Sequence, residues 1–232
     1  MKAELLAAVV HEMRNPLASI LSWSQLLQSG ALDRDKSERG FAAIERGVAT
    51  EIRLIDDLLD FSLAAAGELH LTRRPVELGS LLSDAIKAQV PASAAKHVQL
   101  ELAAAPDTGF ISGDPQRLQQ ITRNLIEHAI ASAPEGGSVR VTLERSGPQL
   151  VMSVSDNGQG MSAPGIAQAF EPLRYGPAAS QPRRAELALG LATVLLLVEL
   201  HGGRVAAQSG GPGTGSTFTA YFPALPDAPP AT

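Results

Sequence analysis

Between residues 36 and 66, apolar side chains recur every three or four positions along an otherwise polar segment. The series consists of Phe41, Ile44, Val48, Ile52, Ile55, Leu58, Leu59 and Phe61. This near-heptad spacing puts the apolar residues on one side of a helix, so the segment is predicted to form one long amphipathic helix. Such a helix needs another apolar surface to cover its stripe.

A second amphipathic helix is expected before it, from residue 2 to about 29. Its stripe consists of Leu5, Leu6, Val9, Met13, Leu17, Ile20, Leu21 and Leu27. Gly30 breaks this helix, and Asp33 or Asp35 is suited to cap the next one. Two long helices joined by a short turn form an antiparallel hairpin. Because a hairpin cannot cover its own stripe, we expect a dimeric four-helix bundle, with a hairpin packed on its own domain as the alternative.

Pro16 stands inside the first helix, in the stretch VVHEMRNPLAS at residues 9–19. An interior proline lacks an amide donor and clashes with the carbonyl four residues back, at a cost of about 3 kcal/mol. That carbonyl belongs to Glu12, which directly follows His11. The sequence therefore predicts a loosened helical turn beside an adjacent imidazole and carboxylate.

After Gly67 the pattern changes to short strands and shorter helices. Helices are expected at 78–90, 114–133 and 186–201, the second opened by Asp114 and Pro115. The expected strands are a short one before a turn at Pro75, 98–103, 138–146, 149–156, GGRVAAQS and STFTAYFP. This order predicts an α+β sandwich, in which helices cover one face of a mixed sheet. The composition of residues 226–232 predicts a disordered tail.

Composition narrows the possible functions. The chain has no cysteine, which excludes disulfides, thiol catalysis and thiolate zinc sites. The net charge is −5 and the basic residues are scattered, so binding to nucleic acid is not expected. No apolar segment is long enough to span a bilayer, and the N-terminus does not resemble a signal peptide. We therefore expect a cytoplasmic protein, or the cytoplasmic part of a larger sensor.

Several polar and glycine-rich segments are candidates for a ligand site. DNGQGM (156–161) follows a strand and places Asp156 before two glycines, so a planar ligand can approach the backbone while the carboxylate accepts a hydrogen bond. GPGTGSTF (211–218) is a similar turn before another strand. Gly190 is expected to open a helix whose N-terminus attracts phosphate, and Asn124 offers an amide oxygen to a cation. Each is weak alone, but their order in one sandwich favours a nucleotide pocket.

In the same order, the motifs resemble those of sensor histidine kinases. HEMRNP resembles the H-box, RNLIEHA the N-box, DNGQG the first glycine box, AFEP the F-box, LGLATVLLLVELHGG the second glycine box, and GTGSTF the last nucleotide-contacting turn. The resemblance implies a dimerisation and phosphotransfer hairpin at 1–67 and a Bergerat-type ATP-binding domain at 68–225. It further implies that ATP phosphorylates a histidine, and that the receiver aspartate of a response regulator takes the phosphoryl group.

For the hairpin, the resemblance implies that His11 is the phosphoacceptor. Glu12 would hold the other ring N–H and strengthen the neutral imidazole as a nucleophile. Asn15 lies one helical turn from His11 and would orient the water that dephosphorylates the partner. Pro16 would act as a hinge between the kinase and phosphotransfer poses.

For the ATP-binding domain, the resemblance implies two cofactors, ATP and Mg²⁺. Asn124 would hold the magnesium ion, Asp156 would read the adenine, and Thr217 would supply a supporting hydroxyl. The residues expected around the nucleotide are Asn124, His128, Asp156, Gly158, Gly160, Gly190, Leu191 and Thr217.

Three positions depart from the family pattern. His128 replaces the asparagine that holds magnesium, and imidazole is a poor ligand for a hard cation. Ala131 replaces a basic residue near the phosphates, and Ala188 replaces a glycine of the second glycine box. Two readings follow: a kinase that tolerates a partly degenerate ATP site, or an ATP-deficient phosphotransferase or pseudokinase scaffold. Another ATPase of this fold, such as a topoisomerase or chaperone fragment, would leave HEMRNP on a hairpin unexplained.

Overall fold

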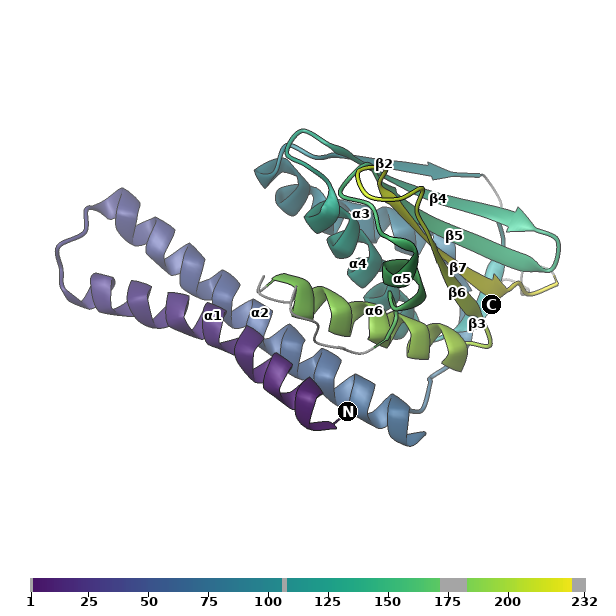
Figure 1. Cartoon of the computed structure of the whole chain (residues 1–232), viewed down its shortest axis with the longest axis horizontal. Coiled ribbons are helices and arrows are strands. Elements are labelled where there is room, and N and C mark those ends of the chain that lie inside the picture. The colour runs from purple at the N-terminus through teal and green to yellow at the C-terminus, as the bar shows by residue number, and fades with distance from the viewer. Residues whose placement is uncertain (1, 106–107, 172–182, 227–232) are drawn as a thin grey trace.

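The computed structural model describes the main chain of residues 2–105, 108–171 and 183–226. Side chains are described over the same ranges except 2–12 and 183–188. A long helical hairpin projects from a layered α/β part, and one end of the hairpin packs against the helices of that part (Figure 1). The hairpin and the sandwich predicted from the sequence are both confirmed.

The hairpin consists of α1 (Lys2–Gln28) and α2 (Arg34–Ala66). Of the two predicted caps, the structure uses Asp33, whose Oδ1 accepts a hydrogen bond from the backbone N–H of Lys36 at 2.8 Å. Gly67 ends α2 in the left-handed conformation, and its N–H donates to the carbonyl of Ala64. The helix α1 continues through Pro16.

The main sheet has five strands in the order β2-β4-β5-β7-β6. The strands are β2 (Gln99–Ala104), β4 (Ser138–Ser146), β5 (Gln149–Asp156), β6 (Arg204–Gln208) and β7 (Ser216–Pro223). The β2–β4 pair is parallel and the other pairs are antiparallel, so the sheet is mixed, as predicted. A small second sheet pairs β1 (Arg74–Glu77) with β3 (Phe110–Gly113).

Three helices cover one face of the main sheet: α3 (Leu78–Ala95), α4 (Pro115–Ser132) and α6 (Arg183–Leu200). A short helix, α5 (Ala163–Ala167), follows β5. Alternate residues of β7 are buried beneath the helices: Ser216, Phe218, Ala220 and Phe222. The opposite face carries paired hydroxyls, Ser153 with Thr219 at 3.0 Å and Ser155 with Thr217 at 2.9 Å. The period of two along each strand thus separates an apolar face from a polar one.

Four details differ from the sequence-based predictions. Pro75 lies within β1 rather than in a turn, and α3 continues through Pro91 to Ala95. Strand β3 was not predicted, because four residues show too little alternation to indicate a strand. The helix α6 begins at Arg183, so Gly190 lies inside it rather than at its N-terminus. Burial of Leu189 and Leu191 on either side favours the helix over the local cost of glycine, about 1 kcal/mol.

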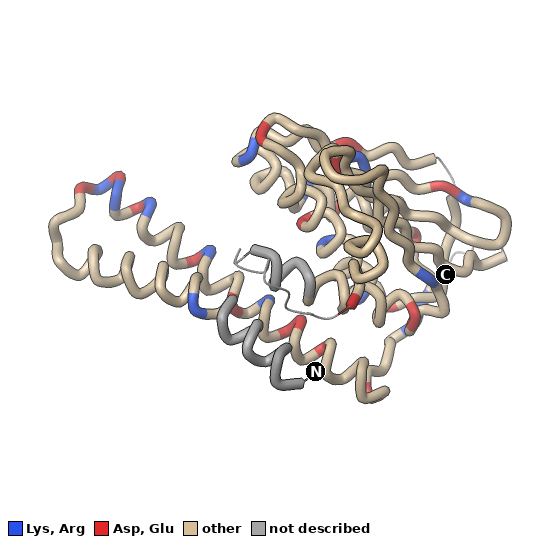
Figure 2. Tube along the Cα trace, viewed as in Figure 1, with Lys and Arg blue, Asp and Glu red and all other residues tan. Residues whose placement is uncertain are grey.

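Charged residues of both signs alternate along α2, whereas Arg14 is the only charged residue among the described side chains of α1 (Figure 2). The C-terminal half of α2 lies against the sandwich, where α2 contacts both α4 and α6. The helix α6 also contacts α1. Within the part of the chain that the structure describes, no helix has both the length and the apolarity to cross a bilayer.

Candidate nucleotide and phosphotransfer site

Asp156 ends β5 and is 8% exposed. Its Oδ1 accepts a hydrogen bond from the backbone N–H of Gly158 at 2.8 Å. Its Oδ2 is buried and has no hydrogen-bond partner among the described residues. Burial raises the pKa of this carboxyl group, although backbone N–H donors partly oppose the rise. A buried acceptor without a partner is costly, so this oxygen is suited to an N–H donor of a ligand.

Two glycine-rich turns lie against each other beside Asp156. The N–H of Gly213 donates to the carbonyl of Gln159 at 2.6 Å, and that of Gly215 donates to Gly158 at 3.1 Å. A Cβ on Gly158 would lie 2.0 Å from the carbonyl oxygen of Ser132, so no larger residue fits there. Gly160 has a φ of 64° and is equally close to the backbone of Gly211. These glycines therefore build the turn itself, and the turn holds the end of β5 against α4.

Asn124 lies on α4 and is 7% exposed. Its Nδ2 donates to the carbonyl oxygen of Gly190 on α6 at 3.3 Å. Its Oδ1 lies 3.5 Å from Nη2 of Arg123. The side chain thus connects two helices, and its oxygen is of the kind that a hard cation prefers. Gly190 is adjacent, since a Cβ there would lie 3.6 Å from Asn124 in ordinary van der Waals contact.

His128 lies one helical turn after Asn124, and its ring meets Phe218 edge to face, with centroids 4.9 Å apart. Its Nδ1 is buried and has no hydrogen-bond partner within the described ranges. Burial lowers the pKa of the imidazole to about 4, so the ring is neutral at pH 7. The side chain brings neither positive charge for phosphates nor an oxygen for a hard cation.

Thr217 lies away from Asp156. It lies opposite Ser155 in the neighbouring strand, and the hydroxyl groups of the two residues form a hydrogen bond on the open face of the sheet. Ser216 is the residue directly opposite Asp156, so these two side chains lie on the same, helix-covered face. The sequence interpretation assigned the supporting hydroxyl to Thr217, whereas Ser216 is the neighbour that shares the face of Asp156. The apolar residues Phe218, Ala220 and Phe222 at alternate positions after Ser216 are the sequence signal that would have placed Ser216 on the inner face.

Leu191 is 4% exposed and belongs to the hydrophobic core, where it supports α6 against the sheet. Phe170 of the AFEP motif lies edge to face with Phe218, with centroids 5.9 Å apart. The backbone carbonyl of Ala131 accepts a hydrogen bond from Nζ of Lys96 at 2.8 Å. The side chain of Ala188 lies outside those that the structure describes.

In the hairpin, Asn15 is exposed on α1, and Pro16 follows it within the helix. The main chain of His11 and Glu12 is part of the same helix, one turn before Asn15. The side chains of these two residues lie outside those described, so their proposed roles stay predictions.

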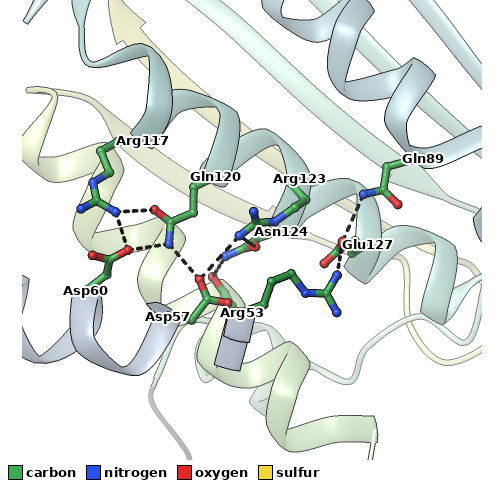
Figure 3. Close-up of polar contacts among 10 residues, drawn as sticks. Arg53, Asp57, Asp60, Gln89, Arg117, Gln120, Arg123, Asn124 and Glu127 are labelled. Atoms are coloured by element: carbon green, nitrogen blue, oxygen red, sulfur yellow. Dashed lines mark hydrogen bonds and ion pairs between the residues drawn. The ribbon is translucent and has the colours of Figure 1, made fainter. Parts of the chain in front are cut away.

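A network of polar side chains joins the hairpin to the sandwich (Figure 3). We call it the polar seam, and its members are Arg53, Asp57 and Asp60 on α2, Gln89 on α3, and Arg117, Gln120, Arg123 and Glu127 on α4. Arg53 pairs with Glu127 at 2.9 Å, and Arg117 pairs with Asp60. The amide of Gln120 donates to Asp57 at 2.8 Å and to Asp60 at 2.9 Å.

The polar seam is largely dry at its centre. Asp57 and Asp60 are 8% and 6% exposed, and burial raises the pKa of Asp57. The sequence interpretation did not predict this contact, although the seam residues of α4 recur every three or four positions and therefore share one helical face. A buried carboxylate is costly unless hydrogen bonds and opposite charges compensate it. The seam therefore specifies how the hairpin and the sandwich fit together.

Comparisons with known proteins identify a family for each of the two parts of the chain. Residues 1–67 match the family model of the His Kinase A (phospho-acceptor) domain, and residues 113–226 match that of the Histidine kinase-, DNA gyrase B-, and HSP90-like ATPase. Sensor protein DivL of Caulobacter vibrioides is 35% identical over 228 residues, which are 96% of this chain and 28% of that protein. Sensor protein GacS of Pseudomonas syringae pv. syringae is 35% identical over 94% of this chain and 24% of its own length. The chain thus spans about a quarter of these relatives.

Solved structures share the fold over the whole chain. Full-length ShkA in complex with AMPPNP has a TM-score of 0.69 and 28% identity, over 97% of this chain and 47% of that one. The histidine kinase ThkA in complex with the response regulator protein TrrA has a TM-score of 0.66 and 19% identity, over 96% of this chain and 62% of that one.

The fold and the site together define an ATPase domain of the histidine kinase, gyrase B and HSP90 type, which follows a helical hairpin in the chain. The chain contains the phospho-acceptor and ATPase domains that make up the core of a two-component sensor histidine kinase.

Proposed function

We propose that this core phosphorylates His11 from ATP and then passes the phosphoryl group to an aspartate of a response regulator. The observation that carries the proposal is the buried Oδ2 of Asp156, which has no partner in the described part of the chain. It lies beside two glycine turns, in a chain whose first helix carries HEMRNP. A neutral adenine presents an exocyclic amine, which is the donor that this oxygen lacks.

The chemistry assigned to His11 is attack by a ring nitrogen on the γ-phosphorus of ATP. The bond from that phosphorus to the β–γ bridging oxygen breaks, and ADP leaves. Glu12 accepts a hydrogen bond from the other ring N–H and stabilises the positive charge that develops on the imidazole. Transfer to the aspartate of the regulator then restores the neutral ring. We assign to Asn15 the orientation of water in dephosphorylation of the regulator, and its exposure one turn after His11 supports this role.

In the pocket, Ser216 is the hydroxyl that we assign beside Asp156, in place of Thr217. Gly158 and Gly160 form the turn at the entrance, and Gly190 borders Asn124. A magnesium ion supplies neutralisation of the phosphate charge when it is bound. Asn124 fits as its one protein ligand, and His128 does not fit. Because three or more His, Asp or Glu do not cluster among the described residues, phosphates and water would complete the coordination.

We also propose that the hairpin dimerises. Large apolar side chains on its outer surface are about half exposed: Leu17, Leu21, Phe41, Ile52, Ile55 and Leu59. The four on α2 follow the near-heptad spacing of a helix that packs on another helix. A second copy of the chain is the simplest partner, because it would form the four-helix bundle expected of the family. We place the core in the cytoplasm, as part of a longer sensor.

The alternative function is phosphotransfer without ATP. The neutral ring of His128, packed against Phe218, favours it, as do Ala131 and Ala188 at positions where the family has a basic residue and a glycine. In that case His11 would accept phosphoryl groups from a partner, or the chain would act as a scaffold.

Labelling with [γ-³²P]ATP and Mg²⁺ separates the two functions. We expect acid-labile label on the wild-type chain and none on His11→Gln, with nucleotide binding retained by that variant. Absence of label, together with absence of nucleotide binding by calorimetry, would support phosphotransfer without ATP.

A further inference from the structure

Arg123 lies on α4 between Asp57 of the hairpin and Asn124, the candidate ligand for a cation (Figure 3). Its Nη2 is 3.7 Å from Oδ1 of Asp57 and 3.5 Å from Oδ1 of Asn124. Its Nε is buried without a hydrogen-bond partner among the described residues. One guanidinium group is therefore shared between an acceptor on the hairpin and an acceptor in the sandwich, at distances that leave both contacts weak.

The shared guanidinium faces the oxygen that a metal ion would need. The Nδ2 of Asn124 already donates to Gly190, which fixes the amide and turns Oδ1 toward Arg123. A guanidinium and a divalent cation at the same oxygen would repel each other, with water screening part of the repulsion because the Arg123 side chain is 32% exposed. Loading the cation therefore requires Arg123 to move away from Asn124.

The other contacts of the polar seam do not depend on Asn124. Arg117 pairs with Asp60, Gln120 bridges Asp57 and Asp60, and Arg53 pairs with Glu127. If Arg123 leaves, Asp57 keeps the amide of Gln120 but loses the guanidinium beside it. The hairpin is then held less firmly, because a buried carboxylate has lost part of its compensation.

We propose that Arg123 is an interdomain latch that makes docking of the hairpin through Asp57 compete with cation binding at Asn124. The inference rests on the proposed role of Asn124 in binding the metal. In the docked arrangement Asp57 holds Arg123 against Asn124 and lowers the affinity for the metal–nucleotide complex. By thermodynamic reciprocity, the metal–nucleotide complex weakens docking by the same factor. Arg123 acts through Asn124 and is a positioning residue.

The test uses Asp57→Asn and Arg123→Gln in the full chain, with AMPPNP titrated by calorimetry in Mg²⁺ and in EDTA. Asp84→Asn is the matched control, because Asp84 forms an exposed ion pair with Lys87 on the surface of the sandwich. We expect each seam variant to raise the affinity for Mg·AMPPNP about fivefold or more and to leave metal-free binding unchanged. The double variant should gain no more than either single variant, because both break one interaction. The control should match the wild type.

Hydrogen exchange gives a second measurement that does not depend on activity. Mg·AMPPNP should speed amide exchange in α2 around residues 53–60 of the wild type, whereas exchange there should already be fast in Arg123→Gln.

Weaker nucleotide binding in Arg123→Gln would overturn the latch and show that Arg123 helps to hold the phosphates. Equal changes with and without metal, or none, would also overturn it. If any result that overturns the latch is found together with normal labelling of His11, the proposed function still holds and only the latch is wrong. Absence of both label and nucleotide binding in the wild type would overturn both.

Discussion

Asp156 has opposite effects on stability and on ligand binding. Burial raises its pKa, so ionising this carboxyl group costs more in the folded state, where its Oδ2 lacks a partner among the described residues. The unfolded chain ionises more easily, so this group lowers the stability of the fold as the pH rises above its unfolded pKa. A ligand N–H that reaches Oδ2 would offset the cost.

Asp156→Asn should therefore stabilise the nucleotide-free fold and weaken nucleotide binding. We expect a higher melting temperature than the wild type at pH 7, with the gain shrinking toward pH 4, where the carboxyl group of the wild type is increasingly protonated. Affinity for AMPPNP should fall about tenfold or more, because a hydrogen bond to a charged acceptor is lost. Scanning calorimetry and titration calorimetry measure the two effects. A variant with unchanged nucleotide affinity would contradict the role of Asp156.

For His128, in contrast to Asp156, stability of the fold is predicted to fall as the pH is lowered. Its pKa is about 4 in the fold and about 6.5 in an unfolded chain, so between these values the unfolded state binds more protons. Stability should fall as the pH is lowered through this window. His128→Asn should reduce that loss between pH 7 and pH 5, and should raise the affinity for Mg·AMPPNP by restoring an oxygen ligand.

His97→Asn is the control for His128→Asn, because His97 is exposed and its backbone, with φ of 54°, is one that asparagine also adopts. The control should change neither the acid sensitivity nor the nucleotide affinity. An unchanged Mg·AMPPNP affinity in His128→Asn would remove His128 as the weak point of the metal site.

The pairing of β5 with β7 decides which hydroxyl lies on the same face of the sheet as Asp156. Ser216 is opposite Asp156 beneath the helices, and Thr217 is opposite Ser155 on the open face. Ser216→Ala should lower nucleotide affinity about two- to tenfold, the effect of one neutral hydrogen bond. Thr217→Val, on the neighbouring residue of the same strand, should leave it unchanged. Loss of affinity only in Thr217→Val would show that the register argument is wrong.

Regular elements were predictable where their periodicity was long. The strands 138–146 and 149–156 and the helix opened by Asp114 follow the predicted pattern closely, because each has an apolar face of constant period. Pro91 and Gly190 misled the interpretation, since both are poor helix residues in isolation. Tertiary packing outweighs these preferences. Buried side chains on both sides of Pro91 keep α3 helical, and buried side chains on both sides of Gly190 keep α6 helical.

In the molecule as a whole, the two domains meet through a surface that the sequence did not indicate. Asp57 and Asp60 belong to a segment with many charged residues, and such carboxylates usually face solvent. Their burial depends on Arg117, Gln120 and Arg123, about sixty positions away in the chain. Pairings of this kind follow from how two folded parts dock, and the period of a single helix carries no information about them. The apolar stripe of α2, by contrast, was predicted, and five of its eight residues are exposed.

That exposed stripe predicts the oligomeric state. Ile55→Glu should convert a dimer to a monomer at micromolar concentration, because it places a charge in the centre of the expected bundle. Val90→Glu is the control, since Val90 is equally exposed but lies on the sandwich. Light scattering measures the mass of each variant. A wild-type chain that is monomeric in this range would contradict the dimer.

The most direct test of the account is to locate the phosphoryl group. The full chain is incubated with Mg·ATP and digested near neutral pH, and the peptides are sequenced by mass spectrometry under conditions that preserve phosphohistidine. We predict a phosphoryl group on His11, absent from Asp156→Asn at limiting ATP and restored when ATP is raised. Phosphorylation at another residue, or none on His11 at saturating ATP, would contradict the assignment of this core as a kinase that acts on its own first helix.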